Sequence, residues 1–220
     1  MSLIIFSCSP RPESTSNSAA IARAFREGFT AETKESADIY YLYQRKQWEI
    51  YQKLFEENTE IIFAMPLFVE CVPGLLMEFL ESLRPKEDSG EKAKMAFILQ
   101  SGFEEACQLR TAERYLETLP GYLGCAYAGT LLKGGMFALS LVSEIKKAKM
   151  LQPFFEMGKL YARERRFEKT RVTAFAAPER YSKGMCLLSN LLQPISNVAW
   201  KFMARKLGAN GSLDARPYDV

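Results

Sequence analysis

LIIFSCSPRPESTSNSAAIARAF, which spans residues 3–25, predicts a strand, a hydroxyl-rich loop and a helix in immediate succession. Residues 3–6 form a short apolar run, which is typical of a strand that is buried on both faces. Pro10 and Pro12 end this strand, and from Ser18 onward apolar residues recur at helical spacing. Such a strand–helix unit is the building block of α/β sheets, so we expect it to begin one.

The loop of this unit is suited to bind a phosphate group. A helix N-terminus offers backbone N–H groups without partners and the positive end of the helix dipole. Arg11 adds a positive charge, and hydroxyl or amide groups come from Ser9, Ser14, Thr15, Ser16, Asn17 and Ser18. The loop has no glycine, which excludes the Gly-rich dinucleotide fingerprint and the lysine-ended loop that binds nucleoside triphosphates. The alternative is that Ser16 or Asn17 only caps the helix.

The composition predicts an ordinary globular protein. A chain of 220 residues, 48% of them hydrophobic, holds one α/β domain with appendages, or at most two small domains. Its apolar runs are all shorter than the ~20 residues that a membrane-spanning helix needs. The N-terminus leads directly into a strand, without a basic region or a cleavage site. We therefore expect a cytoplasmic protein.

The residue types that are missing restrict the chemistry. The sequence has no histidine, which excludes Ser-His and Cys-His nucleophile pairs, histidine bases and histidine metal ligands. The cysteines form no C-x-x-C pair, so we expect neither a metal site nor a disulfide framework. They are Cys8, Cys71, Cys107, Cys125 and Cys186. Any reaction must then depend on carboxylates, on lysine or on a bound cofactor.

The rest of the N-terminal part alternates strand and helix patterns. Apolar runs predict strands at residues 3–6, 36–41, 60–65, 93–99 and 125–132. Helical spacing predicts helices that begin near Ser18 and Pro73 and helices that span residues 47–58 and 104–123. This order describes an α/β fold with a doubly wound, five-stranded parallel sheet and crossover helices on both faces. The loops at 9–17, 66–72, 100–103 and 133–135 then meet at one edge, where such sheets bind ligands.

Three motifs in these loops resemble the flavodoxin-like NAD(P)H-dependent FMN reductase and iron–sulfur-flavoprotein-related family. They are Ser9-Pro10-Arg11 with Ser16-Asn17-Ser18, Pro66-Leu67-Phe68-Val69 with Pro73-Gly74-Leu75-Leu76, and Gln100-Ser101-Gly102-Phe103. The resemblance covers most of residues 1–135 and implies an FMN cofactor. It implies that the phosphate is held by Ser9, Arg11, Ser16, Asn17 and Ser18. It implies that the isoalloxazine ring is bordered by Pro66, Leu67, Phe68 and Val69 and by Ser101, Gly102 and Phe103.

Two features depart from the family pattern. Family members with an iron–sulfur cluster carry a tight group of cysteines after the third strand, whereas Cys71 stands alone, so no cluster is expected. Phe68 stands where the family usually has tyrosine or tryptophan. We expect Phe68 to pack on the flavin ring, and the alternative is a core phenylalanine that covers the sheet edge.

The resemblance implies an oxidoreductase that passes electrons from NAD(P)H through FMN to a small acceptor such as a quinone. A flavin accepts hydride itself, which agrees with the lack of histidine. The first alternative is a flavodoxin-type electron carrier that acts with protein partners, and the second is a non-catalytic FMN-binding protein. No nucleic-acid partner is expected.

Residues 137–220 are predicted to form a helical extension to the domain of residues 1–136. The domain carries 14 Lys and Arg against 19 Asp and Glu, and the extension carries 15 against 7. Helices are expected at 139–150 and 153–167, with a loop at 168–181 and a further helical stretch at 183–207 that is interrupted near Pro194. The last helix is too apolar to be left in water, so we expect the extension to cover the domain and to help form a homodimer. A membrane surface is the least favoured partner.

Overall fold

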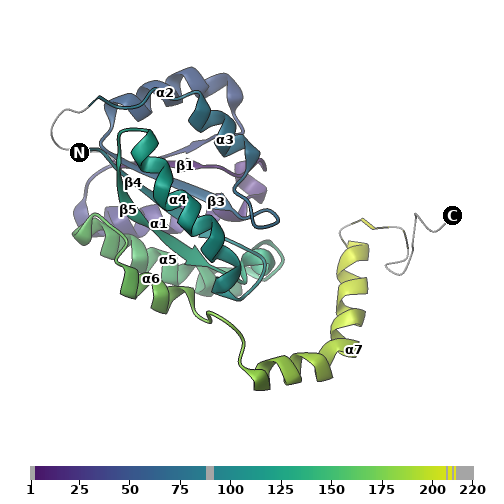
Figure 1. Cartoon of the computed structure of the whole chain (residues 1–220). Coiled ribbons are helices and arrows are strands. Elements are labelled where there is room, and N and C mark those ends of the chain that lie inside the picture. Colours follow the sequence, from purple (N-terminus) through teal and green to yellow (C-terminus); the bar gives the residue numbers. More distant parts are fainter. Residues whose placement is uncertain (1–2, 88–91, 207, 210, 212–220) are drawn as a thin grey trace. The chain divides into compact units, whose positions relative to one another are not determined.

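Five parallel strands form a central sheet in the computed structural model of the protein, which describes residues 3–87, 92–206, 208, 209 and 211 (Figure 1). The strands are β1 (Leu3–Ser7), β2 (Ala37–Tyr41), β3 (Glu60–Pro66), β4 (Lys94–Gln100) and β5 (Ala126–Lys133). They lie in the order β2-β1-β3-β4-β5, and each neighbouring pair is parallel. The doubly wound sheet expected from the sequence is therefore confirmed.

Helices cover both faces of the sheet, with α1 and α5 on one face and α2, α3 and α4 on the other (Figure 1). The helices are α1 (Asn17–Thr33), α2 (Trp48–Glu57), α3 (Gly74–Glu81), α4 (Arg110–Tyr122), α5 (Glu144–Glu164), α6 (Lys169–Ala176) and α7 (Lys183–Lys206). Short 3-10 helices are η1 (Glu13–Thr15), η2 (Arg45–Gln47), η3 (Ala106–Leu109) and η4 (Met136–Ser140).

The core lies on both sides of β1 and β3, whose residues are all buried. On one face, the ring of Phe6 stacks on Phe63 with the centroids 5.3 Å apart, and it meets Phe79 of α3 at the same distance. On the other face, Phe25 of α1 meets Tyr161 of α5 at 5.7 Å. This two-sided burial explains why the strand sequences are continuous apolar runs rather than alternating ones.

Helices α1 and α5 pack with their backbones in direct contact. A Cβ atom at Gly28 of α1 would lie 1.9 Å from the carbonyl oxygen of Phe155. A Cβ atom at Gly158 of α5 would lie 2.1 Å from the carbonyl oxygen of Phe25. Each helix therefore contributes one glycine to the crossing, and no larger residue leaves room for the backbone opposite.

An arginine fixes the C-terminal end of α5. Arg165 directly follows the helix in a left-handed conformation, with φ of 52°. Its guanidinium donates to Glu60 Oε2 at the start of β3 and to Glu35 Oε1 before β2, each at 2.8 Å, and lies 5.2 Å from the ring centre of Phe29. These contacts join α5 to two strands and to α1, at the sheet edge opposite the strand-end loops.

The C-terminal helices differ from the sequence-based prediction in two places. The helices expected at 139–150 and 153–167 are one helix, α5, with Pro153 inside it. Phe154, Met157 and Tyr161 continue a buried face past Pro153, so packing outweighs the missing backbone donor. The loop expected at 168–181 contains α6, whose first turn is capped by the Glu168 carboxylate, which accepts from the Arg171 backbone N–H.

The chain divides into two compact units, Met1–Arg180 and Tyr181–Val220. Helices α5 and α6 belong with the sheet in the first unit, because α5 packs along α1 and α6 packs against β5. Helix α7 belongs to the second unit. No helix among the described residues is long and apolar enough to cross a membrane.

The glycine crossing yields a stability prediction. Gly158→Ala should lower the free energy of unfolding by about 1–3 kcal/mol, because the added methyl group forces the α1 and α5 backbones apart. The better helix propensity of alanine, worth up to about 1 kcal/mol, offsets only part of this loss. Urea denaturation of the full chain measures the change. Gly121→Ala in α4 is the matched control, since its methyl group would meet no atom within 4 Å; an equal loss in both variants contradicts the prediction.

Candidate functional site

The loops at the carboxyl edge of the sheet converge as the sequence analysis expects. The backbone N–H of Leu67 donates to Gln100 O at 2.7 Å, which joins the loop after β3 to the end of β4. The backbone N–H of Ser101 donates to Lys133 O at 3.1 Å, and that of Met136 donates to Ser101 O at 2.9 Å. The loops after β3, β4 and β5 are therefore held together by their own backbones.

The N-terminus of α1 is tied to the same loops by two side-chain amides. Asn17 Nδ2 donates to Met136 O in the loop after β5 at 2.9 Å. Gln100 Nε2 donates to Ser18 Oγ at 3.4 Å, so the end of β4 also reaches the first turn of α1. Four segments far apart in the sequence thus surround one point.

The helix cap is Ser16 rather than Asn17. Ser16 Oγ accepts from the backbone N–H of Ala19 at 3.1 Å, and Ser16 has extended backbone angles, as a cap residue should. The backbone N–H groups of Asn17 and Ser18 have no hydrogen-bond partner in the described part of the chain. These two donors and the helix dipole therefore remain available to an anion.

A cavity of about 290 Å³ lies at this point. It is lined by Ser9, Arg11, Asn17, Ser18, Pro66, Leu67, Phe68, Gln100, Ser101, Gly102 and Phe137. Nine of the twelve predicted site residues are among these lining residues. The volume is close to the lower end of small-molecule pockets, which start at about 300 Å³.

Three predicted residues lie outside the cavity lining. Ser16 is buried and serves the helix cap. Val69 is 96% exposed, and Phe103 is also exposed, while its carbonyl oxygen accepts from Ser101 Oγ at 3.0 Å. Phe103 therefore shapes the site through its backbone, and Val69 lies at the tip of a turn.

Two lining residues were not predicted from the sequence. Gln100 ends β4, and its position next to Ser101 is the signal that could have identified it. Phe137 comes from η4 and lies two residues beyond the loop expected at 133–135. A Cβ atom at Gly102 would lie 3.3 Å from Phe137 Cβ, so glycine lets the two loops approach closely. No pattern near Phe137 indicates that approach, because it depends on the fold.

The rim of the cavity includes a strained two-residue turn. Phe68 and Cys71 exchange two backbone hydrogen bonds of 2.9 Å, and the residues between them, Val69 and Glu70, have φ of 47° and 65°. Hairpin turns of this kind usually contain asparagine and glycine, and a β-branched residue at positive φ is an outlier. The turn directs Phe68 to the cavity and leaves Cys71 exposed outside it.

The charges around the cavity favour an anion. Arg11 is the one charged side chain among the described residues that line it, and no carboxylate does so. Glu13, which follows Arg11 by two residues, is paired with Arg23 at 2.9 Å. Lys133 points elsewhere, since its Nζ donates to Phe175 O at the end of α6 at 2.8 Å, and burial lowers the pKa of this lysine.

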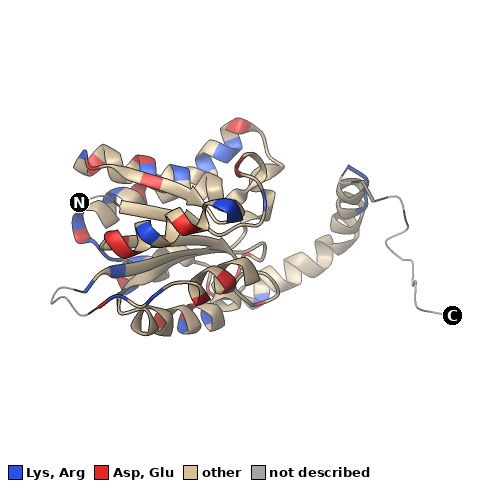
Figure 2. Ribbon diagram, turned by 90° about the horizontal axis from the view of Figure 1, so that it is seen from above, with Lys and Arg blue, Asp and Glu red and all other residues tan. Residues whose placement is uncertain are grey.

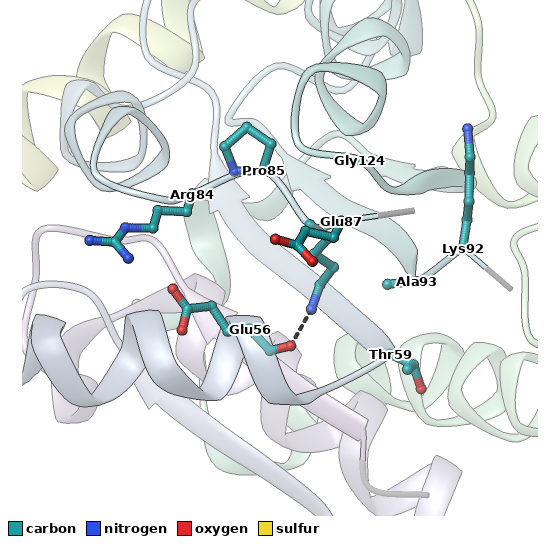
Figure 3. A pocket seen from close by; sticks show the side chains of 9 residues that line it. Glu56, Thr59, Arg84, Pro85, Glu87, Lys92, Ala93 and Gly124 are labelled. Atoms are coloured by element: carbon teal, nitrogen blue, oxygen red, sulfur yellow. Dashed lines mark hydrogen bonds between the residues drawn. The ribbon is translucent and has the colours of Figure 1, made fainter. Parts of the chain in front are cut away.

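A larger cavity of about 420 Å³ lies at the opposite edge of the sheet, where Thr59, Ala93 and Gly124 precede β3, β4 and β5 (Figure 3). Lys86, one of the cations that line it, donates to Glu56 O at the C-terminal end of α2 at 2.8 Å. Lys86 therefore serves as a helix cap. Because ligands of doubly wound sheets bind at the carboxyl edge, we place the functional site in the smaller cavity.

Comparisons with known proteins identify the fold. No family model and no curated protein matches the sequence. Among solved structures, an FMN-dependent NADH-azoreductase from Bacillus anthracis in complex with FMN is 13% identical and covers 76% of this chain and 99% of its own, with a TM-score of 0.54. An NAD(P)H:quinone oxidoreductase from Methanothermobacter marburgensis is 16% identical, covering 74% and 96%, with a TM-score of 0.53. These similarities show a flavodoxin-like fold.

The cysteine next to the cavity is predicted to be inert. Cys8 is fully buried, and burial raises the pKa of its thiol well above the ordinary value; burial also raises the pKa of Cys125 to about 11. The test is the rate of reaction with a disulfide reagent at about pH 7 to 9. The exposed Cys71 and Cys186 should react in a fast phase, whereas Cys8 and Cys125 should react only when the protein unfolds.

The matched control is the Cys71→Ser and Cys186→Ser double variant, which should lose the fast phase and keep the phase that needs unfolding. Fast modification of two thiols in this variant under native conditions would contradict the assigned burial.

Proposed function

We propose that this chain is an FMN-dependent oxidoreductase that takes hydride from NAD(P)H and reduces a small acceptor such as a quinone. The observation that carries the proposal is the cavity at the carboxyl edge of the sheet. It combines the unpartnered backbone N–H groups at the start of α1 and the Arg11 guanidinium with apolar walls. An FMN-bound azoreductase and a quinone oxidoreductase share the fold and support the same assignment.

The phosphate of FMN would be held at the N-terminus of α1. The backbone N–H groups of Asn17 and Ser18 and the hydroxyls of Ser9 and Ser18 are donors there, and Arg11 supplies the opposite charge. Ser9 is buried, and its Oγ accepts from the Arg11 backbone N–H at 3.2 Å, which orders the loop. A dianionic monoester therefore meets preorganised donors and an arginine in one place.

The flat ring of FMN would be held by the remaining walls of the cavity. Pro66 and Leu67 supply apolar surface, and Ser101 and Gly102 bring backbone close to the ring edge. Phe68 and Phe137 are 47% and 43% exposed at the mouth of the cavity. A large aromatic ligand would cover these two side chains, which otherwise face water.

The protein's own contribution to the reaction is to bind, orient and exclude water. When bound, FMN supplies the hydride acceptor and the one- or two-electron donor. The lining residues include neither histidine nor a carboxylate, and hydride transfer to a flavin depends on the cofactor rather than on either of them. A nicotinamide would have to reach the face of the flavin ring that the cavity walls leave open.

Flavin binding tests the phosphate assignment. The purified chain should bind about one FMN and appear yellow, and Arg11→Gln should weaken FMN about 10- to 100-fold through the loss of charge-assisted hydrogen bonds. Riboflavin, which lacks the phosphate, should bind equally well to both proteins. Titration with fluorescence detection measures both ligands.

Arg84→Gln is the control, because it removes the same charge from an exposed arginine at the opposite edge of the sheet. A chain that ignores added FMN contradicts the proposal. Equal losses of FMN and riboflavin in Arg11→Gln would show that Arg11 does not meet the phosphate.

Stopped-flow reduction distinguishes an enzyme from the alternative, a flavodoxin-type electron carrier. Anaerobic mixing with NADH or NADPH should bleach the bound flavin much faster than free FMN, and a quinone should then restore the colour. If both nicotinamides bleach the bound flavin no faster than free FMN, while a reductase does reduce it, the carrier is the correct assignment.

A further inference from the structure

The large apolar side chains of helix α7 gather on one side of its helical wheel. The second unit buries no residue of α7, and its large apolar side chains are between 46% and 72% exposed. They are Met185, Leu187, Leu188, Leu191, Leu192, Ile195, Val198, Trp200 and Phe202. With 3.6 residues per turn, all of them except Trp200 fall within an arc of about 160°. Such a face is much wider than the seam of a two-stranded coiled coil.

The opposite face of α7 is polar but uncharged over most of its length. It carries Ser189, Asn190, Gln193, Ser196 and Asn197. Trp200 lies on this face, about 60° from the nearest edge of the apolar arc. The helix bends about halfway along (Figure 1), where Pro194 removes a backbone donor. Each half therefore keeps a short amphipathic surface.

The charges of α7 all have one sign. Lys183, Lys201, Arg205 and Lys206 lie on it, and it has no Asp or Glu (Figure 2). Residues 1–180 carry 24 Lys and Arg against 24 Asp and Glu, whereas residues 181–220 carry 5 against 2. The excess positive charge of the protein therefore belongs entirely to the second unit.

We propose that α7 lies in the surface of an anionic membrane, with its apolar face in the lipid and its basic residues at the headgroups. A wide apolar face, low net hydrophobicity and basic residues without acidic ones are the properties of helices that bind in the membrane interface. The helix does not cross the bilayer, because its polar face and its bend have no place in a hydrocarbon core.

Charge favours a membrane surface over the two other partners considered from the sequence, which are the first unit of the same chain and a second copy of α7. Two copies of α7 packed face to face would bring eight positive charges together without a carboxylate on either helix to offset them. The first unit has no net charge to attract a basic helix. An anionic lipid surface complements both the apolar face and the four cations. Each cation near the headgroups raises the binding constant about fivefold.

Sedimentation of the full chain with lipid vesicles tests the proposal. The protein should bind vesicles that contain phosphatidylglycerol, bind pure phosphatidylcholine at least tenfold more weakly, and dissociate as salt is raised. Replacing Lys201, Arg205 and Lys206 by glutamine should weaken binding to the anionic vesicles about 100-fold. The fluorescence of Trp200 should shift to shorter wavelength on binding, and Trp200→Phe should abolish the shift although Trp48 remains.

A matched pair of variants separates the apolar face from simple charge. Leu191→Glu with Ile195→Glu places two carboxylates in the centre of the apolar arc, and Ser189→Glu with Gln193→Glu places two on the polar face. Both pairs change the charge equally, so the first pair should weaken vesicle binding at least tenfold more than the second. The thermal unfolding of the first unit should be the same in both.

Several outcomes would overturn the proposal. They are a lack of binding to either vesicle, equal binding to both, or equal effects of the two carboxylate pairs. A light-scattering mass of two chains that the Leu191→Glu and Ile195→Glu pair reduces to one, without vesicle binding by the parent chain, would assign the face to a second copy. That result would support the homodimer expected from the sequence.

Discussion

The direct contact between the α1 and α5 backbones is the constraint on which the site depends. Gly28 and Gly158 let each helix meet a carbonyl group of the other, so the position of α1 on the sheet is set by α5. The N-terminus of α1 carries the free N–H groups of the cavity, and Asn17 bonds to Met136, in the segment that leads into α5. A change in the crossing would therefore move the N–H groups proposed to hold the phosphate relative to the loops after β4 and β5.

Burial on both faces made the sheet predictable from the sequence. Residues such as Ile4, Ile62 and Ile98 lie in central strands and must be apolar whichever way they point, so each strand is a continuous apolar run. Parallel pairing then requires helices between the strands and brings all the strand-end loops to one edge. The apolar runs that predict the strands and the parallel topology both place these loops at the same edge, and for this reason nine of the proposed site residues line a single cavity.

The features that the sequence did not predict arise from contacts between distant residues. Pro153 normally ends a helix, but Phe154 and Tyr161 keep α5 continuous by packing on α1. Helix α6 depends on the burial of Val172 and Ala176 rather than on a strong local pattern. Phe137 reaches the cavity only because Gly102 and η4 approach each other. None of these contacts has a short-range signature.

The cavity and the apolar face of α7 belong to different units of the chain. Every residue that lines the cavity falls between Ser9 and Phe137, within the first unit, which has no net charge. The residues that line the proposed flavin site thus belong to the first unit, whereas the exposed apolar side chains of α7 need a partner of their own. A basic amphipathic helix attached to a unit without net charge can bring that unit to an anionic surface. On the two proposals made above, α7 brings the protein to an anionic surface and the first unit holds the flavin.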